Sequence, residues 1–224
     1  MTFSLVGRCQ RTGMLGLAIG SSSVAVASRC AWVRAGVGAV ATQNITDPRL
    51  GRLGLDLMEQ GLSASAARDL LIAAGHFPEY RQLALIDREG NTAHHSGAGT
   101  LGRNAAVERP DCVAAGNLLK SEAVPAAMAD AFAASSDLHL ADRLLLGIEA
   151  GLEAGGEVGP VHSAGLVVAD RQSWPICELR VDWHEAPIAE LRRVWAVYEP
   201  QMADYLTRAL DPAAAPSYGV PGDP

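Results

Sequence analysis

Hydrophobic and polar positions alternate along some parts of this chain and follow helical spacing along others. The alternating runs predict strands, and apolar positions three or four residues apart predict helices. Predicted strands lie within residues 2–9, 15–23, 24–43, 81–97, 112–119, 163–170 and 177–184. Predicted helices occupy residues 49–61, 63–75, 121–135, 138–155 and 187–210. Pro200 lies inside the last helix, which predicts a kink there.

The order of these elements predicts the fold class. Strands occur in groups that suit antiparallel pairing, and helices occur in pairs, so the chain lacks the strand–helix alternation of a doubly wound parallel sheet. We therefore predict an α+β fold, a four-layer αββα sandwich of two stacked antiparallel sheets. No linker divides the chain, so residues 1–211 are expected to form a single domain. A loose, proline- and glycine-rich tail is expected over 212–224.

Composition limits the classes of function. Hydrophobic residues make up 49% of the 224 residues but aromatic residues only 5%, which predicts a core built from Ala, Val and Leu. The net charge is −7, Lys120 is the only lysine, and no stretch concentrates the arginines. A nucleic-acid partner is therefore not expected. No apolar run is long enough to cross a bilayer, so no membrane partner is expected either.

Four cysteines are scattered at positions 9, 30, 112 and 177. None forms a C-x-x-C pair or has a histidine at metal-ligand spacing, which favours buried free thiols. Free thiols fit a reducing compartment, and early arginines interrupt any signal-peptide core, so we expect a cytoplasmic protein. From the usual behaviour of soluble proteins we expect a homo-oligomer, specifically a homodimer.

The opening residues MTFSLVGRC carry the first candidate for chemistry. If Met1 is removed, Thr2 presents a hydroxyl and a free α-amine on one residue, which is a nucleophile with its own general base. A small second residue such as threonine normally permits that removal. The plainer interpretation is that Thr2 is only a β-branched residue that starts a strand.

Several segments resemble a known family. Similarity to the bacterial proteins called domain of unknown function 1028 extends over TFSLVGRCQRTGMLGLAIGSSSVAV (2–26), WVRAGVGAVATQ (32–43), GLDLMEQGLSASAARDLL (54–71), VAAGNLL (113–119) and ELRVDWHEAPIAELRR (178–193). Those proteins are placed in the N-terminal-nucleophile (Ntn) hydrolase fold, so the resemblance implies an Ntn-hydrolase-like αββα sandwich. The family has no established common activity. Residues 97–112 depart from its pattern, which predicts a different substrate preference.

The resemblance implies a site around Thr2. Thr2 would attack an amide carbonyl, with Arg34 as a nearby cation and the Asn117 side chain as an oxyanion donor. The residues expected to bind the ligand or orient the amine are Ser21, Ser22, Ser23, Gln43 and Asn44. Plainer roles also exist, namely an ion pair for Arg34, a turn or bulge for Asn117, and polar strand ends for the serines.

Two hypotheses of function follow. The favoured one is an amidohydrolase that needs no cofactor and cleaves an amide bond of a small metabolite. The alternative is a non-catalytic protein of the same fold that binds a small ligand or a partner through residues 97–112.

A third option is a metal-dependent hydrolase that uses His162, Asp182 and His184, because the last two would share one strand face. A hydrogen-bonded pair is the plainer interpretation, and no metal site is expected. The glycine spacing GAGTLG at 97–102 is interpreted as a loop, since no convincing helix follows it.

Overall fold

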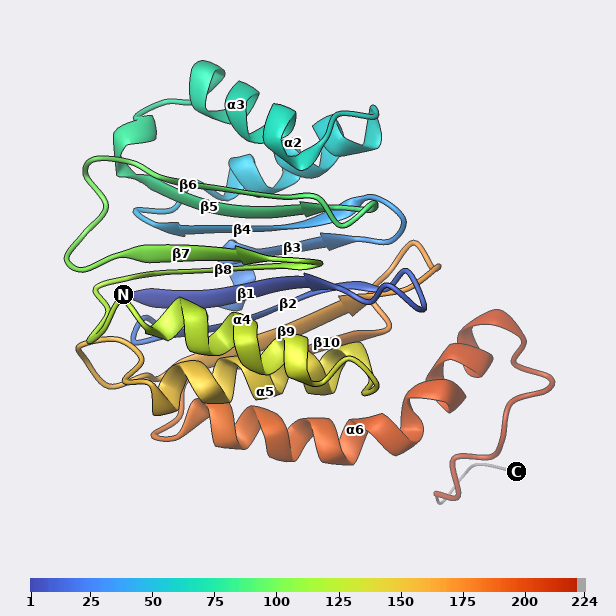
Figure 1. The fold of residues 1–224 in the computed structure, drawn as a ribbon. Helices are drawn as coiled ribbons and strands as arrows, with labels where there is room; N and C mark the ends of the chain where they lie inside the picture. Colours follow the sequence, from blue (N-terminus) through green and yellow to red (C-terminus); the bar gives the residue numbers. More distant parts are fainter. Residues whose placement is uncertain (221–224) are drawn as a thin grey trace.

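The computed structural model describes residues 1–220, which are built on two antiparallel sheets (Figure 1). The larger sheet has the strand order β10-β9-β2-β1-β8-β7. Its strands are β1 (Thr2–Arg8), β2 (Leu15–Ser21), β7 (Ala105–Arg109), β8 (Cys112–Asn117), β9 (Ser163–Ala169) and β10 (Cys177–Val181). The smaller sheet has the order β3-β4-β5-β6. Its strands are β3 (Ala31–Arg34), β4 (Gly38–Asn44), β5 (Arg81–Asp87) and β6 (Thr92–Ser96).

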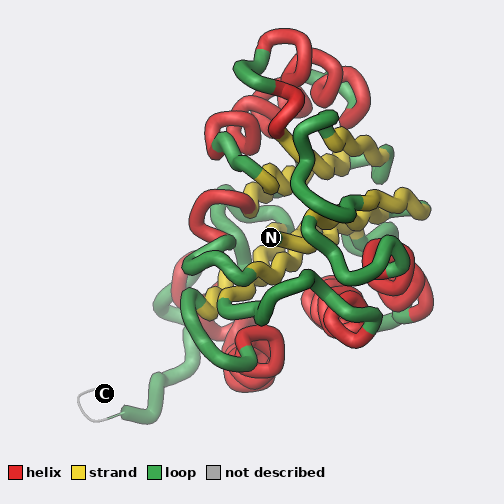
Figure 2. Tube along the Cα trace, turned by 90° about the vertical axis from the view of Figure 1, so that its left-hand side faces the viewer, coloured by secondary structure: helices red, strands yellow, loops and turns green. Residues whose placement is uncertain are grey.

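Helices cover the outer face of each sheet and complete four layers (Figure 1; Figure 2). The smaller sheet is covered by α2 (Pro48–Glu59) and α3 (Ala64–Ala74). The larger sheet is covered by α4 (Val124–Ala134), α5 (Leu140–Glu153) and α6 (Pro187–Leu210). Two short helices, α1 (Ala27–Cys30) and η1 (Pro78–Tyr80), precede β3 and β5. The predicted α+β class and the αββα sandwich are confirmed.

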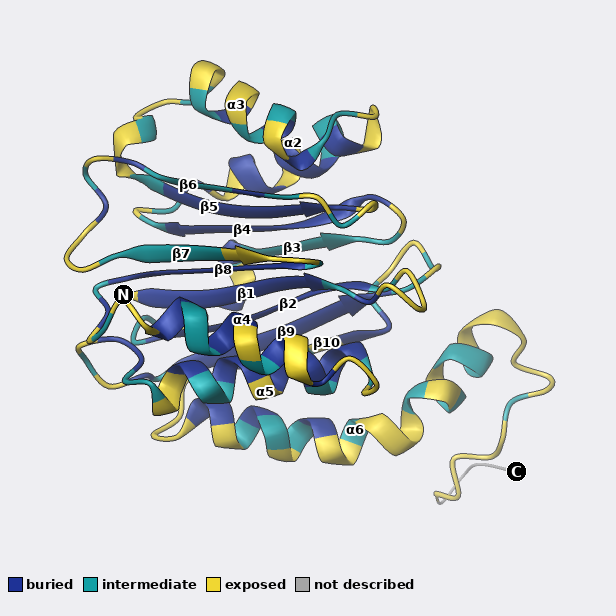
Figure 3. Cartoon of the chain, viewed as in Figure 1, coloured by how far each residue is buried: buried dark blue, intermediate teal, exposed yellow. Residues whose placement is uncertain are grey.

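Alternation along the strands sorts apolar side chains into three layers, one between the sheets and one beneath each helix layer. On β1, Phe3 and Leu5 face the helices, whereas Val6 faces the smaller sheet. Figure 3 shows most strands buried and the helices exposed on their outer sides. Thr2 and Ser4 have the same parity as Val6, so their side chains point between the two sheets.

Three predicted segments differ from the structure. Residues 24–43 contain the helix α1 ahead of two strands, because a helix of one turn is too short to give a periodic pattern. Residues 97–112 contain the edge strand β7, whose polar and small residues hide the alternation. The last predicted strand, 177–184, ends at Val181.

The last helix and the tail are arranged partly as predicted. α6 changes direction in its second half (Figure 1), and Pro200, which lies inside the helix, accounts for the bend. Residues 212–220 form neither helix nor strand, yet the Arg208 guanidinium lies 3.8 Å from the Tyr218 ring centroid. This part of the tail therefore folds back on the end of α6. The predicted tail residues 221–224 lie outside the described residues.

The cysteines are all free and buried, as predicted, at Cys9, Cys30, Cys112 and Cys177. Burial raises the pKa of Cys112 and of Cys177 to about 12. Both thiols are therefore protonated at neutral pH and unreactive. Among residues 1–220, no helix has the length and apolar character that crossing a membrane would require.

Candidate active site

The first residue of β1 belongs to a row of four buried polar residues on adjacent strands. Thr2 pairs with Asn117 of β8, and the β1–β2 register places Ser21 on its other side. Ser21 pairs in turn with Ser163 of β9. Each of the four has at most 4% of its surface exposed. Strand pairing therefore gathers polar groups from distant parts of the sequence at the end of the sandwich where the chain starts (Figure 1).

The carbonyl group of Met1 lies against this row. Thr2 Oγ1 donates a hydrogen bond to Met1 O at 2.5 Å, and Ser21 Oγ donates to the same oxygen. The two hydroxyl oxygens are 3.2 Å apart. Two hydroxyls thus converge on one carbonyl oxygen, in the place where Thr2 would meet an acyl group. The structure therefore brings the predicted residues Thr2, Ser21 and Asn117 together.

Hydrogen bonds connect Thr2 with a cation. Ser21 Oγ lies 2.8 Å from Ser23 Oγ, and Arg29 Nη2 donates to Ser23 Oγ at 3.0 Å. Arg29 belongs to α1 and also donates to the Val24 carbonyl oxygen at 2.7 Å, which fixes its guanidinium. The Arg29 charge is therefore linked by hydrogen bonds through Ser23 to Ser21, whose hydroxyl oxygen lies 3.2 Å from that of Thr2. Sequence reasoning missed Arg29, because it interpreted this helix as part of a strand.

Arg34 does not lie in this row. It ends β3 and pairs with Gly38, and the five residue-to-residue steps along β4 from Gly38 to Gln43 span about 17 Å. Its guanidinium forms ion pairs with Asp56 at 2.8 Å and with Glu59 at 2.7 Å, both on α2. The structure therefore matches the plainer interpretation of Arg34, an ion pair away from Thr2.

Buried amides connect the two sheets behind the row. Ser4 Oγ donates to Gln43 Oε1 at 2.8 Å, and Gln43 Nε2 donates to Gln82 Oε1 at 2.9 Å. Asn117 Nδ2 donates to the same Gln82 oxygen at 3.0 Å. Gln43 thus uses both polar atoms inside the protein, and Gln82 is a member that sequence reasoning did not single out. A connected network of this kind holds the facing strands in register.

Asn117 keeps one polar atom unused. Its Oδ1 is buried and has no hydrogen-bond partner among residues 1–220, whereas its Nδ2 donates to Gln82. The unused atom is an acceptor, so it suits an incoming N–H or ammonium group. The Nδ2 group, which the family resemblance implies as the oxyanion donor, uses one of its two N–H groups on Gln82.

The side chain of Asn44 holds neighbouring backbone segments together. Its φ is 72°, in the left-handed region that asparagine tolerates. Its Nδ2 donates to Tyr80 O at 2.7 Å, and its Oδ1 accepts from Leu101 N at 3.1 Å. Asn44 therefore ties the loop before β7 to the smaller sheet, and both of its side-chain polar atoms have protein partners.

Glu157 is a buried acid that the sequence did not indicate. It lies in the loop after α5, and its backbone bridges to Leu119 just beyond β8. The residue is 1% exposed, and neither carboxylate oxygen has a hydrogen-bond partner among residues 1–220. Burial raises the pKa of Glu157 to about 7, although the amino terminus and Ser22 lower it. The surrounding sequence GGEVG has no periodic pattern that could have revealed this burial.

The optional metal site is not formed. β10 ends before Asp182, so Asp182 and His184 do not share a strand face. Asp182 instead pairs with Arg180 at 3.0 Å. The His162 ring stacks on an exposed tryptophan, with centroids 4.3 Å apart. Within the described part of the chain, no group of three or more His, Cys, Asp or Glu side chains could hold a metal ion.

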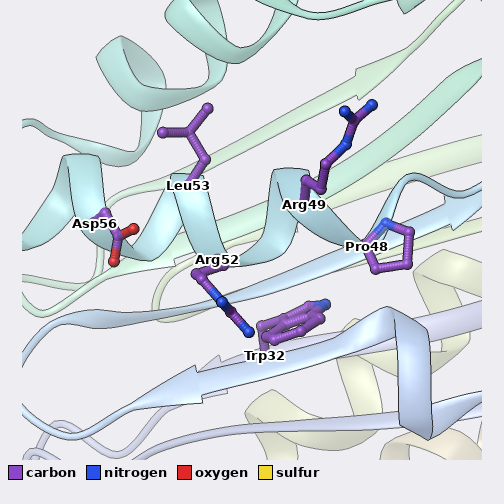
Figure 4. Close-up of a pocket in the computed structure, with 6 residues that line it drawn as sticks. All are labelled: Trp32, Pro48, Arg49, Arg52, Leu53 and Asp56. Atoms are coloured by element: carbon purple, nitrogen blue, oxygen red, sulfur yellow. The ribbon is translucent and has the colours of Figure 1, made fainter.

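A separate surface pocket of about 290 Å³ lies beside α2. Its lining residues, drawn in Figure 4, are Trp32, Pro48, Arg49, Arg52, Leu53 and Asp56. Arg52 lies over the Trp32 ring, and Asp56 is engaged with Arg34. No nucleophile lines this pocket, so the candidate chemistry remains at Thr2.

The model of the family of unknown function DUF1028 matches residues 2–191, a range that includes the whole polar row and Glu157. Among solved structures, the chain is similar to protein SPO2555 from Silicibacter pomeroyi, which is described as a DUF1028 protein. The two share 28% sequence identity with a TM-score of 0.84, over 91% of this chain and 89% of that one. The predicted family resemblance is confirmed.

Two Anbu structures are more distantly similar. A mutant from Hyphomicrobium sp. strain MC1 is 16% identical with a TM-score of 0.41, over 98% of this chain and 100% of that one. Anbu, an ancestral beta-subunit, from Yersinia bercovieri is 12% identical with a TM-score of 0.40, over 92% of this chain and 97% of that one. No curated protein matches the chain. The αββα layers, with a strand that begins at Thr2, are those that the order of the elements predicts.

Proposed function

This chain belongs to the family of unknown function DUF1028, and because that description assigns no activity, we propose a function from the geometry around Thr2. The proposal is an Ntn-type amidohydrolase that cleaves an amide bond of a small metabolite after removal of Met1. The observation that carries it is the buried row at the start of β1, where the Thr2 and Ser21 hydroxyls converge on the Met1 carbonyl oxygen.

The reaction has two steps at one residue. Thr2 Oγ1 adds to the amide carbonyl carbon while its proton passes to the Thr2 α-amine, whose ordinary pKa of about 7.7–8.0 suits a general base. The carbon–nitrogen bond then breaks, and the amine leaves with that proton. Water hydrolyses the resulting ester and restores the Thr2 hydroxyl. No cofactor takes part in this scheme.

Neighbouring residues position these groups. Ser21 donates a hydrogen bond toward the carbonyl oxygen, as it does to Met1 O. Asn117 Oδ1, the unused acceptor opposite Thr2, receives a hydrogen bond from the α-amine once that amine is free. Arg29 places its positive charge behind Ser23 and Ser21, which favours the neutral amine that acts as base.

Thr2→Ala provides the direct test. In processed protein, this variant should lose hydrolysis of amino-acid 4-nitroanilides to the background level, because the nearby Ser21 hydroxyl has no α-amine of its own to act as base. Thr2→Ser should keep measurable turnover. Thr12→Ala, in the exposed turn after β1, is the matched control and should match the wild type. Wild-type turnover by Thr2→Ala would remove Thr2 from the mechanism.

A further inference from the structure

Met1 shows where an acyl group can lie at this site. Met1 is an aminoacyl group joined by an amide bond to Thr2, and its carbonyl oxygen accepts hydrogen bonds from Thr2 Oγ1 and Ser21 Oγ. An acyl group carried on Thr2 Oγ1 would place its carbonyl in the same surroundings, since both attachment atoms belong to Thr2. The space around Met1 is therefore a model for the space around the acyl part of a substrate.

A glycine makes room for the Met1 side chain. A Cβ atom added at Gly159 would lie 2.9 Å from Met1 Cε, which is closer than ordinary van der Waals contact. The missing side chain at Gly159 thus leaves room for the end of the thioether on one side, while Met1 itself stays 37% exposed. Once Met1 is removed, that space becomes available to another unbranched apolar chain.

Glu157 supplies a buried carboxyl group two residues before Gly159. It is 1% exposed, and neither of its carboxylate oxygens has a hydrogen-bond partner among the described residues. Burial raises the pKa of Glu157, whereas the amino terminus of Met1 and the neighbouring Ser22 lower it. Removal of Met1 takes this cation away and frees the Thr2 α-amine, which donates to Asn117 Oδ1 in the proposed mechanism, so the buried acid requires another donor or cation.

From these contacts we infer that Glu157 and Gly159 form an acyl subsite for amides of α-amino acids that carry a free ammonium group and an unbranched apolar side chain. Glu157 binds the ammonium group through a charge-assisted hydrogen bond, and the space beside Gly159 receives the side chain. This inference rests on the proposed function, because the acyl group is the one that Thr2 would receive.

Two anilides that differ only in the amino group test the subsite. The probes are L-methionine 4-nitroanilide and its counterpart without the α-amino group, 4-(methylthio)butanoyl 4-nitroanilide. Processed wild-type protein should hydrolyse the amino compound about 10- to 100-fold faster in kcat/KM, the range expected of one charge-assisted contact. Glu157→Gln should remove this preference, because it should lower kcat/KM for the amino compound far more than for the desamino compound.

Gly159→Val provides an independent variant. Its side chain should fill the space beside Met1 and reduce kcat/KM for the methionine anilide about tenfold or more, with little effect on glycine 4-nitroanilide. Equal loss for both methionine-derived anilides in Glu157→Gln would overturn the inference, because Glu157 would then serve the Thr2 amine instead. An unchanged preference in Glu157→Gln would also overturn it.

A binding measurement separates failure of the subsite from failure of the hydrolase. Processed protein should bind free L-methionine in calorimetry, and Glu157→Gln and Met1-retaining protein should each bind it at least about tenfold more weakly. If this pattern holds while no anilide is cleaved, the subsite stands and the proposed hydrolysis fails. If the anilides are cleaved but L-methionine binds equally well to wild type and Glu157→Gln, the hydrolase stands and the subsite is refuted.

Discussion

Single residues near the chain start have hydrogen-bonding capacity that the rest of the described protein does not use. Asn117 Oδ1 and both carboxylate oxygens of Glu157 are buried without a partner among residues 1–220. Buried polar atoms are normally paired, so unpaired ones indicate either a cost to folding or a place for a ligand. Asn117 Oδ1 is an acceptor, and both Glu157 oxygens are acceptors when the acid is ionised, which favours ligands and termini that carry N–H groups.

The buried acid makes stability depend on pH. The pKa of Glu157 is raised by burial from 4.5 to about 7, so the folded chain retains this proton where the unfolded chain releases it. Stability from this residue is therefore present below about pH 4.5 and is lost as pH rises through about 7. As pH rises from about 4.5 to about 7, the unfolding free energy of Glu157→Gln should increase relative to that of the wild type, by up to about 3 kcal/mol.

Urea unfolding of Met1-retaining protein at about pH 4.5 and about pH 8 measures this difference. Glu153→Gln, at an exposed carboxylate on the last turn of α5, is the matched control and should show no comparable change. A Glu157→Gln curve that stays parallel to the wild-type curve across this pH range would show that the acid is not buried as described.

At the scale of elements, the one-turn helix α1 determines which cation serves the site. Arg29 on α1 reaches Ser23, whereas Arg34 on β3 pairs with α2. Arg29→Met should therefore reduce anilide kcat/KM about tenfold or more. It should also raise the apparent pKa on the acid side of the rate profile, because a nearby cation lowers the pKa of an amine.

The matched control for that change is Arg34→Met. It makes the same substitution at the next arginine in the sequence, which does not reach Ser23. It should leave both the rate and the pH profile of anilide hydrolysis near the wild-type values, since its ion pairs lie on the outer helix layer. If Arg34→Met moved the pH profile and Arg29→Met did not, the assignment of the cation would be reversed.

Close packing between α5 and the larger sheet depends on small residues in β1 and β2. Gly16 is paired with Gly7, and a Cβ at Gly16 would lie 2.7 Å from Leu144 Cδ1 and 2.8 Å from Val167 O. The carbonyl cannot move without disturbing the strand pairing. Gly16→Ala should therefore lower the unfolding free energy by about 1–3 kcal/mol in urea.

Gln10→Ala, in the exposed turn between the same two strands, is the control and should stay within about 0.5 kcal/mol of wild type. An equally stable Gly16→Ala variant would mean that α5 can move away from the sheet without cost.

Elements with several turns or alternations could be predicted from the sequence, and short or irregular ones could not. The long helices and the strands around Thr2, Ser21 and Asn117 follow clear periodic patterns, and the order of the elements predicted the way in which the two sheets stack. Arg29 was missed because four residues of helix give no period. Glu157 was missed because a glycine-rich loop shows no pattern of burial, and only the tertiary fold buries it.

At the scale of the whole molecule, the sandwich brings four strands and one loop to the same end. β1 lies inside the larger sheet, so the residue that starts it is flanked by β2 and β8 and covered by the smaller sheet. A residue at the start of an edge strand would lack such neighbours. The central position of β1 is therefore what allows a chain terminus to be surrounded by groups that could activate it.

The intact mass of the protein purified from its native host tests the central claim most directly. The hydroxyl of Thr2 is within the buried row in any case, but it has its own base only when Met1 is gone. We expect a mass lower than that of the full sequence by one methionine residue, which leaves Thr2 with a free α-amine. A mass that retains methionine would contradict the Ntn mechanism and favour a non-catalytic, ligand-binding role for this fold.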